Sequence, residues 1–160
     1  MYVYRILKAP FLSDPLSVIG SELSPGRWNQ KEQGLLYTAS HPALALLETM
    51  AHFETVAFAN LPEMRLFRLE VDETLIRMMN PAALPVGWNG LASMSLTQAY
   101  LIDWIDDPQG AILSCLGVGV PSAILEISTN YLFAPRHTSY SSIKVNASYP
   151  LPLDSRLWRL

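Results

Sequence analysis

Proline and glycine interrupt this chain along its whole length, which limits how long any helix or strand can be. The 160 residues include twelve prolines and eight glycines, without a low-complexity block or an internal repeat. Residues 2–7 are typical of a strand, and apolar and charged residues alternate over 65–72 as on a half-buried strand. From Ala111 onward, short apolar runs broken by Gly, Pro and Asn indicate several short strands. No domain boundary is visible, so we expect one domain over residues 1–160.

Two segments carry helix signals. Ser40 is placed as an N-cap, which predicts a helix over about 40–53. Apolar side chains surround nearly the whole circumference of this helix, so we expect it to be buried. A second helix is predicted over 95–105, opened by a capping box in which Gln98 reaches back to Ser95. Helices and short strands together predict the α+β class.

Composition restricts the partners that the chain can have. Half of the residues are hydrophobic and 16% are charged, against about 25% charged in an average soluble domain, so we expect a partner to cover part of the surface. The net charge of −3 provides no basic footprint for nucleic acid. Cys115 is the sole cysteine, which excludes an internal disulfide. The sequence has neither a signal-peptide pattern nor an apolar run of membrane-spanning length, so we expect a cytoplasmic protein without a membrane or direct nucleic-acid partner.

One short stretch concentrates residues that are suited to chemistry. Between Gly26 and Glu48 lie a loop with Arg27, a strand ending near Tyr37, and the predicted helix with its single carboxylate. An Arg guanidinium can bind a phosphate through two parallel hydrogen bonds, and a Tyr ring can stack on a flat heterocycle. An unpaired carboxylate beside the core is costly unless it finds donors, a cation or a cleft. We expect these three side chains to converge on one cavity, where a ligand that bears a phosphate and a ring could use all three.

Each of these residues also has a structural interpretation that the sequence leaves open. Arg27 follows a Gly in a loop, where most arginines are solvated. Tyr37 could pack its ring into the core, and Glu48 could pair with a structural Arg. Capping alone explains Ser40, although the start of its helix can also lie at a pocket.

A metal site is not expected. His52 follows Glu48 by four residues, but no further Cys or His spacing completes a zinc set. Cys115 and His137 could act as nucleophile and base, yet no local context supports that pairing.

Taken together, these residues resemble the RES domain family, the toxin half of RES/Xre toxin–antitoxin pairs, which is named for its characteristic Arg, Glu and Ser. The likeness spans essentially the whole chain. Ala134 is a departure, because the family usually has Asn before this Pro. The matching segments are Tyr4–Ile6, Gly26–Asn29, Tyr37, Thr38, Ser40, Ala45–Glu48, Trp88, Thr97, Gln98, Trp104, Val120–Ser122, Asn130–Leu132, Pro135, His137, Asp154 and Arg156–Trp158.

The resemblance implies a fold related to ADP-ribosyltransferases, with a split, twisted β core that holds NAD in a cleft. It implies consumption of NAD by hydrolysis, phosphorolysis or transfer of ADP-ribose, and a helix-turn-helix (Xre-like) antitoxin as partner. The oligomeric state stays open, and a homo-oligomer is compatible with the sequence. The residues implied for catalysis are Arg27, Tyr37 and Glu48, and those implied for binding NAD are Arg5, Arg27, Tyr37, Ser40, Ser122 and Asn130.

The chemistry suits these residue types, because breaking the nicotinamide–ribose bond builds positive charge on the sugar. Glu48 can stabilise that charge, and Ser122 or Ser40 can bond the amide or the ribose. Two alternatives remain. One is a ribonuclease-type toxin that uses His137 or His52 with Glu48 as acid and base. The other is a noncatalytic protein-binding module whose apolar surface docks a partner helix.

Overall fold

The computed structural model describes residues 1–9, 11–53, 62–105 and 115–158, and its centre is one seven-stranded sheet. The strand order is β4-β5-β6-β2-β1-β3-β7. The strands β4 and β5 pair in parallel, and every other neighbouring pair is antiparallel. The strands are β1 (Tyr2–Lys8), β2 (Leu36–Ala39), β3 (Met64–Glu70), β4 (Ile76–Met78), β5 (Gly117–Pro121), β6 (Thr129–Phe133) and β7 (Lys144–Pro150).

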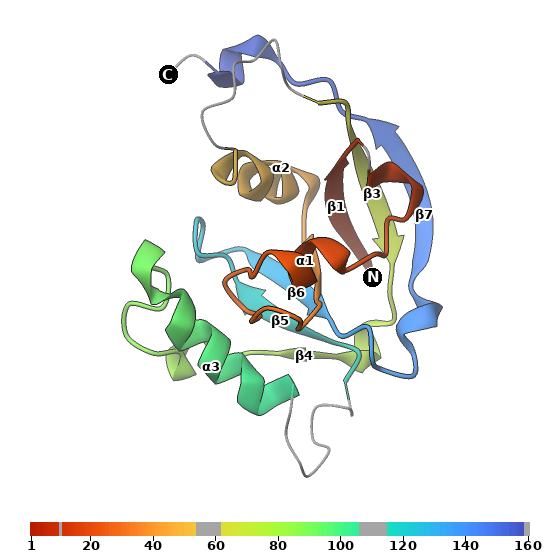
Figure 1. Ribbon diagram of the computed structural model, residues 1–160. Coiled ribbons are helices and arrows are strands. Elements are labelled where there is room, and N and C mark those ends of the chain that lie inside the picture. Colours follow the sequence, from red (N-terminus) through yellow and green to blue (C-terminus); the bar gives the residue numbers. More distant parts are fainter. Residues whose placement is uncertain (10, 54–61, 106–114, 159–160) are drawn as a thin grey trace.

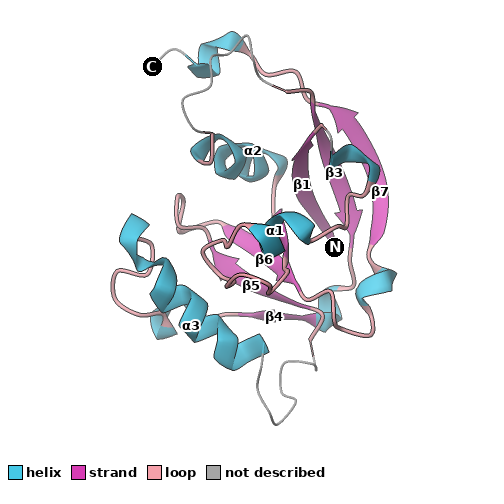
Figure 2. Ribbon diagram, viewed as in Figure 1, coloured by secondary structure: helices cyan, strands magenta, loops and turns pink. Residues whose placement is uncertain are grey.

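The sheet opens in its middle. Strands β1 and β2 share a single aligned pair, Tyr4 with Ala39, whereas β1 and β3 are aligned over seven pairs from Tyr2–Glu70 to Lys8–Met64. Figures 1 and 2 show the β1-β3-β7 half turned away from the β4-β5-β6 half. Two large buried clusters pack on the sheet: one includes Leu132 of β6, and the other joins the two halves, because it includes both Phe67 of β3 and Phe133 of β6. This confirms the predicted α+β class with a two-part β core.

In the part of the chain that the structure describes, three α-helices surround this sheet: α1 (Ile19–Leu23), α2 (Pro42–Ala51) and α3 (Met94–Ile105). Helix α2 packs on the junction of the sheet, where Leu44 and Ala45 contact Ala39 and Ile6. Helix α3 packs over the β4-β5-β6 half of the sheet through Leu101, which is buried with residues of β5 and β6. Short 3-10 turns fill the connections: η1 (Phe11–Ser13), η3 (Glu73–Leu75), η4 (Pro81–Ala83), η5 (Leu91–Ser93), η6 (Tyr140–Ser142) and η7 (Ser155–Trp158).

Both predicted helices exist, but their starts differ from the prediction. His41 caps α2, because its Nδ1 accepts from the N–H of Ala43 at 3.2 Å. Ser40 follows β2 directly, and its N–H extends the pairing with β6 by donating to the carbonyl of Thr129 at 3.0 Å. The Ser95 capping box does not form, because α3 continues directly from η5 and Ser95 lies inside the helix.

The prediction that the first helix is wholly buried is wrong. Leu44 and Ala45 are buried, whereas Ala43 and Leu47 on other faces of α2 are exposed. The helix covers β1 and β2 with one face only, so the apolar residues around its circumference do not all reach the core. None of the described helices has the length and apolarity needed to cross a membrane.

Candidate active site

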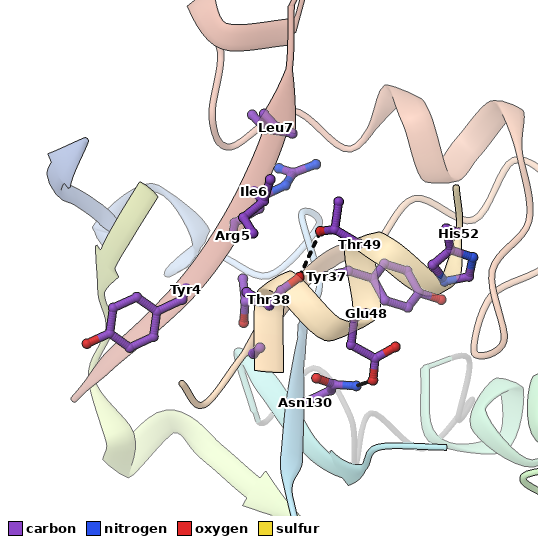
Figure 3. Close-up of a pocket in the computed structure, with 12 residues that line it drawn as sticks. Tyr4, Arg5, Ile6, Leu7, Tyr37, Thr38, Glu48, Thr49, His52 and Asn130 are labelled. Atoms are coloured by element: carbon purple, nitrogen blue, oxygen red, sulfur yellow. Dashed lines mark hydrogen bonds between the residues drawn. The ribbon is translucent and has the colours of Figure 1, made fainter. Parts of the chain in front are cut away.

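A cavity of about 240 Å³ lies where the sheet opens, between β1, β2, β6 and α2. Four of the residues named from the sequence line it: Arg5, Tyr37, Glu48 and Asn130. Figure 3 shows the Glu48 side chain pointing from α2 toward the amide of Asn130 on β6. The remaining lining residues are Tyr4, Ile6, Leu7, Thr38, Ala39, Ala45, Thr49 and His52.

Glu48 is held by two hydrogen bonds to the same carboxylate oxygen. Its Oε1 accepts from Ser122 Oγ at 2.7 Å and from Asn130 Nδ2 at 2.5 Å. Within the described part of the chain, Oε2 has no hydrogen-bond partner. A half-buried carboxylate that is fixed on one oxygen can offer the other to a ligand.

Ser122 is fully buried and uses all of its hydrogen-bonding capacity. Besides donating to Glu48, its Oγ accepts from the N–H of Ile124 at 3.1 Å and of Leu125 at 3.0 Å. One hydroxyl therefore joins the turn after β5 to the carboxylate on α2. A hydroxyl that donates a hydrogen bond to Glu48 and accepts two from backbone N–H groups is held in one orientation, so it is suited to positioning that carboxylate.

Asn130 leaves one buried acceptor unsatisfied. Its Oδ1 has no hydrogen-bond partner among the described residues, while its Nδ2 donates to Glu48. A buried polar atom without a partner is uncommon and marks a position where a ligand or water can bond. An acceptor beside the Glu48 carboxylate fits the N–H and O–H groups of a nucleotide, so this side of the cavity is compatible with NAD as substrate.

Tyr37 both packs into the core and lines the cavity. Its hydroxyl donates to Asn29 Oδ1 at 2.7 Å and accepts from the N–H of Trp28 at 3.2 Å. Burial raises the pKa of Tyr37 well above its usual value, against weaker opposing effects of the Trp28 amide and the Arg27 charge. The phenol therefore stays neutral at physiological pH.

Arg27 is not among the residues that line the cavity, in contrast to the prediction that it shares one with Tyr37 and Glu48. Its Nη1 donates to the carbonyls of Trp88 at 2.7 Å and Gly90 at 3.0 Å. Burial lowers the pKa of Arg27, while electrostatic interactions with the Glu48 carboxylate and the Tyr37 hydroxyl act to raise it. The guanidinium thus lies outside the cavity but within the electrostatic influence of its acid and phenol.

Arg5 and Ser40 have mainly structural contacts. Arg5 lines the cavity, yet its Nη1 donates to the carbonyls of Pro15 at 2.7 Å and Ser17 at 2.9 Å, and burial lowers its pKa. Ser40 is not a lining residue, and its backbone N–H is used in the pairing with Thr129.

Three polar residues around Arg27, of which two are buried and Gln98 is partly buried, were not predicted as part of the site. Asn29 is fully buried and contacts Tyr37, while Thr97 and Gln98 on α3 donate to carbonyls of the Arg27 loop. The family pattern includes all three positions, but nothing in the local sequence reveals what they contact. The local sequence places Gln98 in a capping box with Ser95, and it cannot indicate the real contact of Gln98, because that loop lies about 70 residues earlier.

The two histidines considered for acid–base roles lie in different places. His52 lines the cavity, whereas His137 is buried in a turn, where its Nδ1 accepts from the N–H of Ser139 at 3.1 Å. Among the described residues, no group of three or more His, Cys, Asp or Glu side chains is arranged to hold a metal ion.

Comparisons with known proteins agree with this architecture. The sequence model described as "RES domain" matches residues 2–154. A protein named Toxin Res from Pseudomonas putida is 37% identical over 143 residues, which cover 89% of this chain and 92% of the relative. A Prs ADP-ribosylating toxin from Sphingobium sp. is 33% identical over 151 residues, covering 92% and 89% respectively. The M. tuberculosis MbcT-MbcA toxin–antitoxin complex contains a chain with the same fold, at a TM-score of 0.68 and 20% identity, covering 94% of this chain and 83% of that one.

Proposed function

The chain belongs to the RES domain family, and on this premise we propose that it is the toxin of a toxin–antitoxin pair and breaks the bond between nicotinamide and ribose in NAD. The observation that carries the proposal is Glu48, whose carboxylate is fixed on one oxygen by Ser122 and Asn130 at the wall of a cavity. Relatives named as toxins, one of them as ADP-ribosylating, support the same class of activity.

Glu48 acts on the ribose. When the bond between C1′ and the nicotinamide nitrogen breaks, its electron pair stays on that nitrogen, and nicotinamide leaves as a neutral molecule. The positive charge moves to the ribose, which becomes oxocarbenium-like. The free Oε2 of Glu48 stabilises this charge and accepts from a ribose hydroxyl. An acceptor then adds to C1′ and loses a proton. Since the leaving group begins as a cation, no strong general acid is needed.

The size of the cavity divides the substrate between two regions. At about 240 Å³ it is smaller than the roughly 300–1,000 Å³ of typical ligand pockets, so it holds nicotinamide and its ribose, with Tyr37 packed against them. The pyrophosphate then extends out of the cavity toward Arg27, which has two guanidinium nitrogens without partners among the described residues. Arg27 orients the phosphates there and takes no part in bond breaking.

Ser122 acts through Glu48, and Asn130 both holds Glu48 and offers its free Oδ1 to the ligand. Arg5 holds the wall of the cavity through the loop before α1. Water, phosphate or a protein side chain can each accept the ADP-ribose. The partner that restrains this activity is an antitoxin of the helix-turn-helix, Xre-like type; its existence is supported by the structural neighbour, which was solved as a toxin–antitoxin complex.

The test is to incubate purified protein with NAD, with and without phosphate, and to identify the products by mass. Free ADP-ribose indicates hydrolysis, and its phosphorylated form indicates phosphorolysis. Glu48→Gln, with folding verified by circular dichroism, is expected to abolish NAD loss. Glu70→Gln is the matched control, because Glu70 is exposed on β3 and should retain activity. Intact NAD together with RNA cleavage would replace the proposal by the ribonuclease alternative.

A further inference from the structure

The loop that carries Arg27 is held from behind by two side chains of α3. Gln98 Nε2 donates to the carbonyl of Gly26 at 2.8 Å and to that of Asn29 at 3.0 Å. Thr97 Oγ1 donates to the carbonyl of Arg27 at 2.6 Å, and Thr97 is fully buried. Three contacts therefore bind the main chain on both sides of Arg27 and at Arg27 itself, through the carbonyls of residues 26, 27 and 29.

The segment just before α3 holds the other end of the same residue. The carbonyls of Trp88 and Gly90 accept from the Arg27 guanidinium, and Ser93 Oγ donates to the same two carbonyls at 2.8 and 2.7 Å. The rings of Trp28 and Trp88 also pack together, with centroids 5.8 Å apart. Residues 88–98 thus fix both the backbone and the side chain of Arg27.

This arrangement extends to Tyr37 through Asn29. The Asn29 amide accepts from the Tyr37 hydroxyl and from the N–H of Gly26 at 3.0 Å, and it donates to the carbonyls of Ser21 and Gln30. A shift of the loop toward or away from α3 would therefore move the phosphate-binding cation and the phenol together.

From these contacts we propose that Gln98 and Thr97 are positioning residues, which place Arg27 for the pyrophosphate of the ligand. The proposal rests on the function proposed above. Packing alone would need only apolar side chains on this face of α3, whereas Gln98 and Thr97 spend three donor contacts on carbonyls of one four-residue loop. Because Arg27 binds phosphates equally in the ground and transition states, losing its placement weakens NAD binding and leaves the chemical step unchanged.

The experiment measures steady-state NAD cleavage and, in a Glu48→Gln background that keeps the ligand intact, the Kd for NAD. Thr97→Val removes the hydroxyl at nearly constant shape, and Thr97→Ser restores it. Gln98→Glu replaces the donor by an acceptor that faces two carbonyls. We expect KM and Kd to rise about tenfold for Thr97→Val and more for Gln98→Glu, with kcat within about threefold, since a tenfold change corresponds to about 1.4 kcal/mol, which is within the range for one lost hydrogen bond. Thr97→Ser and the exposed control Ser95→Ala should stay close to wild type.

A double-mutant cycle separates positioning from general stability. If Thr97 acts through Arg27, then Thr97→Val should add little to the loss of NAD affinity caused by Arg27→Lys. The inference would be overturned if the losses of NAD affinity in the two single variants multiplied in the double variant. A fall in Tm without a change in KM or Kd for Thr97→Val would also overturn it. If wild type leaves NAD intact but the Kd values follow the expected order, the proposed function fails while the inference stands. If NAD neither binds nor reacts, both fail.

Discussion

The contacts of Ser122 allow its loss to be worked out in advance. Ser122→Ala removes one oxygen that makes three hydrogen bonds, one to the Glu48 carboxylate and two from the amides of Ile124 and Leu125. A bond to a charged group contributes about 1.5–3 kcal/mol and each neutral one about 0.5–1.5 kcal/mol. Since Ser122 has no exposed surface, water cannot easily replace these bonds, and we expect the free energy of unfolding to fall by roughly 2.5–6 kcal/mol.

The effect on catalysis should differ in kind from the effect on stability. Glu48 keeps its bond from Asn130 but can turn about it, so its placement against the ribose is lost in the transition state more than in the ground state. A loss of about 1.4–2.8 kcal/mol of transition-state stabilisation corresponds to a fall of about 10- to 100-fold in kcat. The KM for NAD should change little, because Ser122 has no donor or acceptor left for the ligand.

The assay is NAD loss followed at several substrate concentrations below the Tm of the variant, with a thermal melt alongside. The Tm is expected to fall by roughly 2–4 °C for each kcal/mol lost from the free energy of unfolding in a chain of this length. Ser142→Ala, which removes an exposed hydroxyl on η6, is the matched control and should leave kcat unchanged. A raised KM with an unchanged kcat would show that Ser122 contacts the ligand directly and does not act by positioning Glu48.

Two further changes test other parts of the site. A Cβ at Gly26 would lie 2.6 Å from the Tyr37 hydroxyl oxygen, so Gly26→Ala should displace the phenol and lower NAD turnover at least about tenfold. Gly20→Ala is the control and should leave turnover unchanged, because nothing lies within 4 Å of its added Cβ. Equal activity of the two variants would contradict this prediction. Burial raises the pKa of Tyr140 to about 12, so Tyr140 ionises at lower pH in the unfolded state than in the folded state. The free energy of unfolding should therefore fall as the pH rises from about 10 to 12. Denaturant melts should show a smaller fall for Tyr140→Phe than for wild type, and an identical fall would exclude Tyr140 as the cause.

Local patterns predicted the elements because side-chain periodicity depends on neighbours in sequence. The alternation over 65–72 is seen in β3, where Phe67 and Leu69 are buried and Glu70 is exposed. The predicted caps at Ser40 and Ser95 were wrong. The N–H of Ser40 bonds to the neighbouring strand β6, and Ser95 lies inside a helix that continues directly from the 3-10 turn η5. A capping motif indicates which helix start is favourable, but the tertiary contacts of the preceding residue decide which one forms.

The local patterns and the order of the motifs were enough to predict the α+β class and the RES family, and four of the site residues that the resemblance implied, Arg5, Tyr37, Glu48 and Asn130, line the cavity. How these residues contact one another could not be predicted from neighbours in sequence. Glu48 meets Ser122 and Asn130, 74 and 82 residues later, because β6 pairs with β2 and brings Asn130 opposite Ala39, just before α2 begins. The same long-range pairing of segments put the Arg27 guanidinium on the carbonyls of Trp88 and Gly90. Helical and strand periods fix which face a side chain takes, whereas strand register and loop packing, which join distant segments, fix what it touches.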